Sequence, residues 1–127
     1  MSVNQIRTDA DTIDYDYEND SLFLFVKGDG YSHSLNLDNI LIDFGEENYV
    51  KGVEIQNASK RFGVSKYALK HTHQIDVALN ISDEKIELNI TLTLKIRNKK
   101  LPKAIVAADI NEFNIPSGTM AMSCAIC

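Results

Sequence analysis

The sequence predicts an α+β fold, mainly antiparallel β-structure with about eight strands and one helix near residues 58–70. Apolar and polar residues alternate over residues 74–81 and 86–96, the period of two that marks a half-buried strand. Four extended segments come before these residues. Between those segments and the alternating ones, the residues near 58 show the start of a helix. We expect residues 1–127 to form a single domain, in which a β-meander (71–127) packs onto a β-rich unit that carries the helix (15–70).

The first half contains four predicted strands. Residues 12–17 form a short strand, and the residues before them are expected to be a loosely held lead-in. Residues 22–26 are apolar at every position, which predicts a strand covered on both faces. Residues 31–44 change parity at Asp38-Asn39, which indicates a bulge or break, and residues 49–56 return as a strand.

The helix follows directly. Asn57 is the predicted N-cap, its side-chain oxygen accepting a hydrogen bond from the first turn. The helix then runs from Ala58 toward Leu69 or Lys70. Gly63 weakens it by about 1 kcal/mol relative to alanine, so two short helices separated there are the alternative.

The second half is dominated by one long alternating segment. Residues 86–96 alternate without a miss, which predicts a long, half-buried antiparallel strand. After a turn, residues 101–110 return, and Pro102 indicates a strand start or a sheet edge. Residues 119–127 form the last strand, with Cys124 on its apolar face.

Three pieces of the first half carry a family resemblance. They are Tyr-Asp-Tyr-Glu-Asn-Asp-Ser-Leu-Phe-Leu (15–24), Ile-Leu-Ile-Asp-Phe (40–44) and Val-Lys-Gly-Val-Glu-Ile-Gln-Asn-Ala-Ser-Lys (50–60). In order and spacing they resemble the uncharacterised prokaryotic family called domain of unknown function 2283, over about residues 15–60. The resemblance implies a small β-rich domain that ends in a helix, followed here by a C-terminal extension. It implies no catalytic residue, and by analogy with some members it suggests an antitoxin-like partner of a small toxin.

Charge is distributed unevenly. Residues 1–49 hold two bases and eleven acids (2 − 11 = −9), whereas residues 50–127 hold eleven bases and seven acids (11 − 7 = +4). The halves can therefore attract each other, within one chain or between two copies. No secretory signal or apolar run of membrane-spanning length is present, so we expect a cytoplasmic protein. Two cysteines near the end favour a reducing compartment over a disulfide framework.

Two clusters are candidate metal sites. His71, His73, Cys124 and Cys127 form a set that zinc would accept. However, an offset of three in a strand places the two cysteines on opposite faces, and Cys124 also fits a small buried hydrophobe. The acidic run at residues 9–20 suggests calcium, but it does not fit the EF-hand spacing. Its alternative role is a solvated acidic edge that discourages edge-to-edge pairing.

Other functional signals are weak. His33 has no motif around it, and the sequence lacks a nucleophile elbow, a phosphate loop and a dinucleotide fingerprint. Basic residues at 60–70 and 95–103 could hold phosphates, but without aromatic platforms nucleic-acid binding is not expected.

The predicted function is a non-enzymatic protein-interaction or self-association module. It would bind a protein partner or form a homo-oligomer through sheet edges or the long apolar face of residues 86–96, without a cofactor. A metal-binding domain for zinc or calcium is one alternative, and an antitoxin-like partner is the other.

Overall fold

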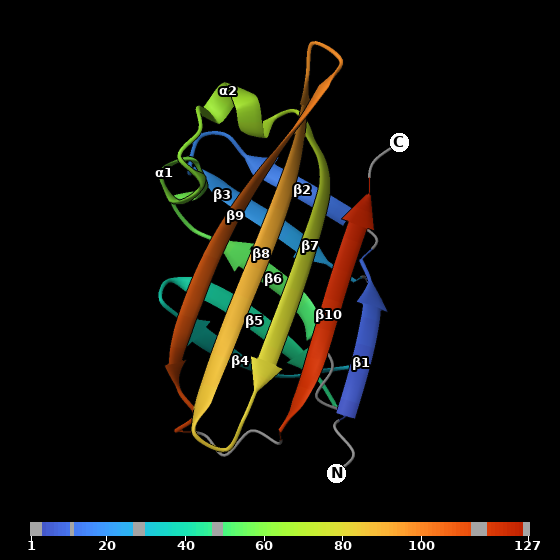
Figure 1. The fold of residues 1–127 in the computed structure, drawn as a ribbon, viewed down its shortest axis with the longest axis vertical. Helices are drawn as coiled ribbons and strands as arrows, with labels where there is room; N and C mark the ends of the chain where they lie inside the picture. Colours follow the sequence, from blue (N-terminus) through green and yellow to red (C-terminus); the bar gives the residue numbers. More distant parts are fainter. Residues whose placement is uncertain (1–3, 11, 27–29, 47–49, 113–116, 126–127) are drawn as a thin grey trace.

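The computed structural model describes residues 4–10, 12–26, 30–46, 50–112 and 117–125. Within these ranges the chain forms ten strands and two short helices (Figure 1). The strands make two five-stranded sheets, sheet A in the order β1-β10-β7-β8-β9 and sheet B in the order β2-β3-β6-β5-β4. The predicted mainly antiparallel fold is confirmed.

Sheet B contains the first half of the chain, apart from β1. Its strands, in sheet order, are β2 (Thr12–Asp16), β3 (Ser21–Phe25), β6 (Val50–Ile55), β5 (Ile40–Gly45) and β4 (Tyr31–Leu37). All neighbours in this sheet are antiparallel. The break predicted at Asp38-Asn39 is the turn of the β4–β5 hairpin, where both residues have positive φ (52° and 65°). Such turns match the twist of the strands they join.

Sheet A contains the second half together with the first strand. Its members are β1 (Asn4–Asp9), β10 (Gly118–Ala125), β7 (Thr72–Ile81), β8 (Lys85–Ile96) and β9 (Lys99–Ile110). β1 pairs with β10 in parallel, and the other pairs are antiparallel. The expectation of a loosely held lead-in is therefore wrong for residues 4–9. These residues have no clear apolar alternation, so their sequence did not predict a strand; their place in the sheet comes from parallel pairing with β10.

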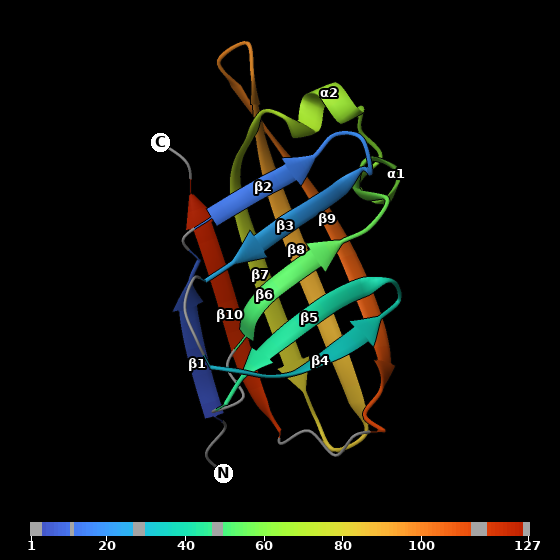
Figure 2. The same ribbon diagram turned by 180° about the vertical axis from the view of Figure 1, so that it is seen from behind.

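The two sheets pack face to face, and the strands of sheet B cross those of sheet A at a large angle (Figure 2). The inner positions of β8 from Ile86 to Leu94 are at most 1% exposed and belong to one core cluster with inner residues of sheet B, such as Leu37 and Ile42, while Ile96 at the end of the strand is partly buried. The predicted apolar face is thus covered within the chain from Ile86 to Leu94, and in the described residues sheet edges and outer faces remain for association.

Two helices form a corner between the sheets. α1 (Ala58–Phe62) ends at Gly63, whose φ of 67° suits a residue without a side chain. α2 (Lys66–Leu69) begins after Ser65, whose Oγ accepts a hydrogen bond from the N–H of Ala68 at 3.0 Å. The alternative of two short helices is the correct one. We call α1 and α2 the helical corner.

Candidate functional site

The predicted zinc ligands are not gathered in the structure. His71 is exposed and packs edge-on against Tyr67, with ring centroids 4.9 Å apart, while His73 is half-buried. Cys124 lies in the core at 7% exposure, the position expected of a small hydrophobe. Cys127 lies outside the described residues. Among the residues that are described, no three His, Cys, Asp or Glu side chains come together in a way that could hold a metal ion.

The acidic run is divided among separate environments. Asp14 and Glu18 are exposed, and the side chains of Asp9 and Asp11 lie outside the described part of the chain. Asp16 accepts hydrogen bonds from the side chain and backbone N–H of Asn19 at 2.7 and 3.2 Å, and these bonds lower its pKa. The run is therefore not one ligand set in the described residues.

Asp20 is the buried member of that run, at 7% exposure. Its carboxylate accepts hydrogen bonds from the hydroxyl of Tyr15 at 2.7 Å and from the Oγ and backbone N–H of Ser59 at 2.7 and 3.0 Å. Its backbone carbonyl accepts from the N–H of Ala58 at 2.9 Å. One residue in the β2–β3 turn thus satisfies the first two N–H donors of α1.

The predicted N-cap is therefore wrong. Asn57 adopts the left-handed conformation, with φ 53°, and its side chain makes no capping bond. The cap comes from Asp20, which is distant in sequence, so no local motif predicts it. Asp20 serves to hold the helical corner against sheet B.

This network shifts two pKa values. Burial tends to raise the pKa of Asp20, but the hydrogen bonds from Ser59 and Tyr15 outweigh it and leave the pKa below its ordinary value. The pKa of Tyr15 is strongly raised, first by burial and then by its hydrogen bond to the Asp20 carboxylate. Both shifts favour an ionised Asp20 and a neutral Tyr15.

Three cations in or directly after the helical corner have contacts within the chain. The Nζ atoms of Lys70 and Lys66 lie 4.3 and 5.5 Å from the ring centroid of Tyr17, a cation–π arrangement. Arg61 donates to the carbonyl of Asp38 at 2.7 Å and pairs with its carboxylate at 3.4 Å. These contacts favour a structural role for the basic residues near the helices.

His33 is packed against a core residue. Its ring stacks on Phe44 with centroids 5.0 Å apart, and its Nδ1 lies 3.1 Å from the Oγ of Ser32. This geometry fits a half-buried packing residue.

The outer face of sheet B carries apolar side chains for which the sequence predicts burial. Phe23 and Phe25 of β3 are half-buried, because their strand is covered on its inner face only. The prediction that residues 22–26 are covered on both sides is therefore wrong. A partly exposed aromatic patch on a sheet face can mark a contact site.

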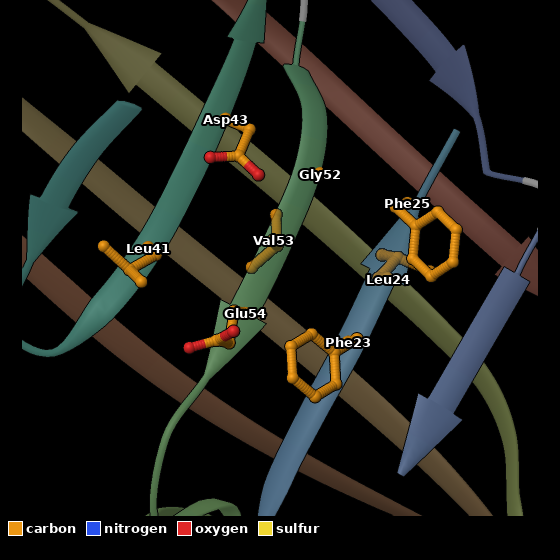
Figure 3. Close-up of a pocket in the computed structure, with 8 residues that line it drawn as sticks. All are labelled: Phe23, Leu24, Phe25, Leu41, Asp43, Gly52, Val53 and Glu54. Atoms are coloured by element: carbon orange, nitrogen blue, oxygen red, sulfur yellow. The ribbon is translucent and has the colours of Figure 1, made fainter. Parts of the chain in front are cut away.

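These phenylalanines border a shallow hollow of about 210 Å³ (Figure 3). Across the strands, Glu54 is paired with Phe23 on one side and Leu41 on the other, and Gly52 with Phe25 and Asp43. Because Gly52 has no side chain, the outer face is open between Phe25 and Asp43. The hollow is lined by Phe23, Leu24, Phe25, Leu41, Asp43, Gly52, Val53 and Glu54.

Carboxylates lie at the rim of the hollow. An added Cβ on Gly52 would lie 3.4 Å from Oδ2 of Asp43 and 3.4 Å from the Cβ of Phe25, so this carboxylate oxygen faces the space above the glycine. The other oxygen of Asp43 accepts a hydrogen bond from Ser34 at 2.5 Å, which fixes the side chain. The surface therefore combines aromatic walls with negative charge.

The outer edge of sheet A is a second exposed feature. β9 is the terminal strand of the sheet, and most of its residues are exposed. Among its apolar side chains, Leu101, Val106 and Ile110 are 43%, 66% and 64% exposed. Long apolar edge strands are templates for pairing with another chain.

The fold and these two surfaces define a small two-sheet β-domain with a helical corner. By sequence the chain belongs to the family described as a protein of unknown function (DUF2283), whose model matches residues 12–59. This confirms the predicted resemblance. The match covers sheet B and the start of α1 and leaves β7 to β10 beyond it.

Two archaeal relatives extend over most of the chain. A protein of Methanosarcina mazei named "Putative hypoxanthine phosphoribosyltransferase" is 34% identical over 86% of this chain and 89% of its own. An uncharacterized protein of Methanocaldococcus jannaschii is 41% identical over 87% of this chain and 96% of its own. No solved structure matches. Among the described residues, no helix has the length and apolar character needed to cross a membrane.

Proposed function

We propose that the protein is a non-enzymatic protein-binding domain, and that the outer face of sheet B binds a basic segment of its partner. The observation that carries this proposal is the hollow between Phe23, Phe25 and the carboxylates of Asp43 and Glu54. Its aromatic walls are half-buried and lie on a sheet face that nothing in the described chain covers.

The chemistry of the hollow favours an arginine side chain. A guanidinium group stacks on aromatic rings and donates hydrogen bonds in a planar fork to carboxylates. Phe23 and Phe25 supply the rings, and Asp43 and Glu54 supply the acceptors. Gly52 provides the room for the arginine stem.

Peptide titration followed by NMR tests this proposal. A blocked Gly-Arg-Gly-Arg-Gly peptide should shift the amide signals of Phe23, Gly52 and Glu54 in a saturable way. The matched peptide with citrulline in place of arginine has the same shape without the charge, and it should bind at least about tenfold more weakly. Equal binding of the two peptides, or shifts elsewhere only, would rule out this site.

Charge-neutral variants of the protein complete the test. The Asp43→Asn/Glu54→Gln variant should lose the preference for arginine. Glu87→Gln, a matched change in sheet A, should keep it, because Glu87 belongs to β8 and pairs with Lys85. A toxin partner would be one form of this function, and its binding should depend on the same residues.

The name of the Methanosarcina relative suggests a different class, an enzyme. An assay of phosphoribosyl transfer to hypoxanthine separates the two classes. We expect no turnover from the purified protein. Turnover that survives removal of contaminating enzyme would overturn the non-enzymatic proposal.

A further inference from the structure

The direction of the backbone groups along β9 follows from its hairpin with β8. A two-residue loop joins the paired residues Ile96 and Lys99, and both loop residues, Arg97 and Asn98, have positive φ (52° and 63°). In such hairpins the residues that flank the loop exchange both main-chain hydrogen bonds, and bonded pairs then alternate along the ladder. Odd-numbered residues of β9 therefore bond to β8. Even-numbered residues direct their N–H and C=O groups to the outer edge.

Two of the outward positions are blocked. Pro102 has no N–H group, and at an even position it takes no bond away from the ladder with β8. The outward N–H of Ile110 donates to the carboxylate of the neighbouring Asp109 at 2.7 Å. Both are local devices that limit pairing at an edge.

Between these blocks lie three consecutive outward positions, Ala104, Val106 and Ala108. No strand of the described chain pairs with this side of β9. Their side chains are two alanines and a valine, with no charge or proline among them. The segment offers three N–H and three C=O groups at regular spacing to an incoming strand.

We propose that a second copy of the chain occupies this edge, with the two β9 strands antiparallel and Val106 on the two-fold axis. Only one antiparallel register pairs all three outward positions with one another: Val106 with Val106, and Ala104 with Ala108. It forms six main-chain hydrogen bonds and joins the two A sheets into one sheet. This proposal does not depend on peptide binding by sheet B.

The same register is complementary in charge. It places Lys103 of each copy opposite Asp109 of the other, because both lie three residues from Val106. Both side chains are exposed and lie on the same face of the strand, since directly opposed residues share a face. A shift by one pairing step would separate these charges. Hydrogen bonding and charge therefore select the same alignment, which is the argument for a second copy over an unrelated strand.

Charge reversal with rescue tests the proposal on the full chain. Light scattering after size-exclusion chromatography should show a dimer at about 100 µM. Lys103→Asp should raise the dissociation constant about tenfold or more, and Asp109→Lys should do the same, because each places like charges opposite each other. The double variant Lys103→Asp/Asp109→Lys should restore dimerisation.

A backbone variant tests the pairing itself. Val106→Pro removes an N–H that points away from β8, so the intrachain ladder stays complete while the centre of the dimer is blocked. It should be monomeric with a circular dichroism spectrum like that of the parent. A monomeric parent protein would overturn the proposal, and so would a dimer unaffected by the charge reversals. If Val106→Pro does not fold, the charge reversals and their rescue decide alone.

Discussion

The carboxylate of Asp20 accepts hydrogen bonds from both the Oγ and the backbone N–H of Ser59, at 2.7 and 3.0 Å, although the residues are 39 positions apart in the chain. Asp20 lies in the turn after β2, and Ser59 lies in the first turn of α1. The contact ties the helical corner to sheet B. Because α1 also contacts β9, this one pair helps to set the position of the corner between the two sheets.

Removing the carboxylate should destabilise the fold. Asp20→Ala leaves the Tyr15 hydroxyl and the Ser59 N–H without their acceptor, and we expect a loss of about 2–4 kcal/mol in the free energy of unfolding. Ser59→Ala removes a single donor and should cost about 1 kcal/mol. Urea denaturation measures both.

Asn57→Gly is the matched control. Asn57 has positive φ and makes no side-chain cap, so glycine should be neutral or slightly stabilising. A loss of 1 kcal/mol or more in this variant would show that Asn57 caps the helix after all.

Stability should fall at acid pH through Asp20. Its pKa is lowered in the folded protein, so its contribution is complete above the ordinary value of 3.8 and is lost as pH falls through the folded value. Urea midpoints measured between pH 6 and pH 2.5 should therefore decline less steeply in Asp20→Asn than in the parent. Equal slopes would contradict the assignment.

The loss of stability at alkaline pH should depend on Tyr15. Its pKa is raised above the ordinary value of 10.0, so its contribution is complete below pH 10 and is lost as pH rises further. Tyr15→Phe should flatten the loss of stability above pH 10. Spectroscopic titration should show one tyrosine that ionises only as the protein unfolds.

Filling the hollow should separate binding from stability. A Cβ on Gly52 meets its nearest neighbours at 3.4–3.5 Å, close to ordinary contact. Gly52→Ala should change the free energy of unfolding by about 1 kcal/mol or less, because lower backbone entropy in the unfolded chain offsets the tight fit. It should weaken binding of the arginine peptide in the NMR titration. Unchanged binding would place the peptide elsewhere.

The part of the chain that contains the family match should not fold alone. The inner residues of sheet B are buried in one cluster with those of β7 and β8, so a fragment of residues 1–70 would expose that face to water. We expect this fragment to aggregate or to lack a cooperative thermal transition. A cooperative transition would show instead that residues 1–70 are an independent domain.

Metal should be dispensable for folding. Cys124 is buried away from the exposed His71, so treatment with a chelator should leave the melting temperature unchanged. In a Cys127→Ser background, the Cys124 thiol should react with a thiol reagent only after unfolding. Stoichiometric zinc in protein purified without added metal would instead support the His–Cys site.

Much of the fold is encoded in local patterns. The alternation of β8, the break at Asp38-Asn39 and the weakness at Gly63 each lead to the observed element, because each depends on neighbours in sequence. β1 was missed since its place depends on the main chain of β10, which comes last. The cap by Asp20 was missed for the same reason, as it is a long-range contact.

The candidate site was harder to predict. The run of apolar residues in β3 indicates burial but does not say whether a second layer covers the outer face. That face is uncovered in the structure, and this difference identifies Phe23 and Phe25 as surface residues. In the sequence, the aromatic pair, Asp43, and Gly52 with Glu54 stand in separate segments. Only the strand register brings them together.

The parallel pairing of β1 with β10 has a consequence for synthesis. β1 is synthesised before the other described strands, whereas β10, its partner among them, is synthesised after all the others. Main-chain hydrogen bonds between β1 and β10 can therefore form only after β2 to β9 have been synthesised. Sheet B can assemble earlier on the nascent chain, but its apolar inner face stays uncovered until β7 and β8 follow. The β1–β10 and β10–β7 pairs are thus the last strand pairs of sheet A that the order of synthesis permits.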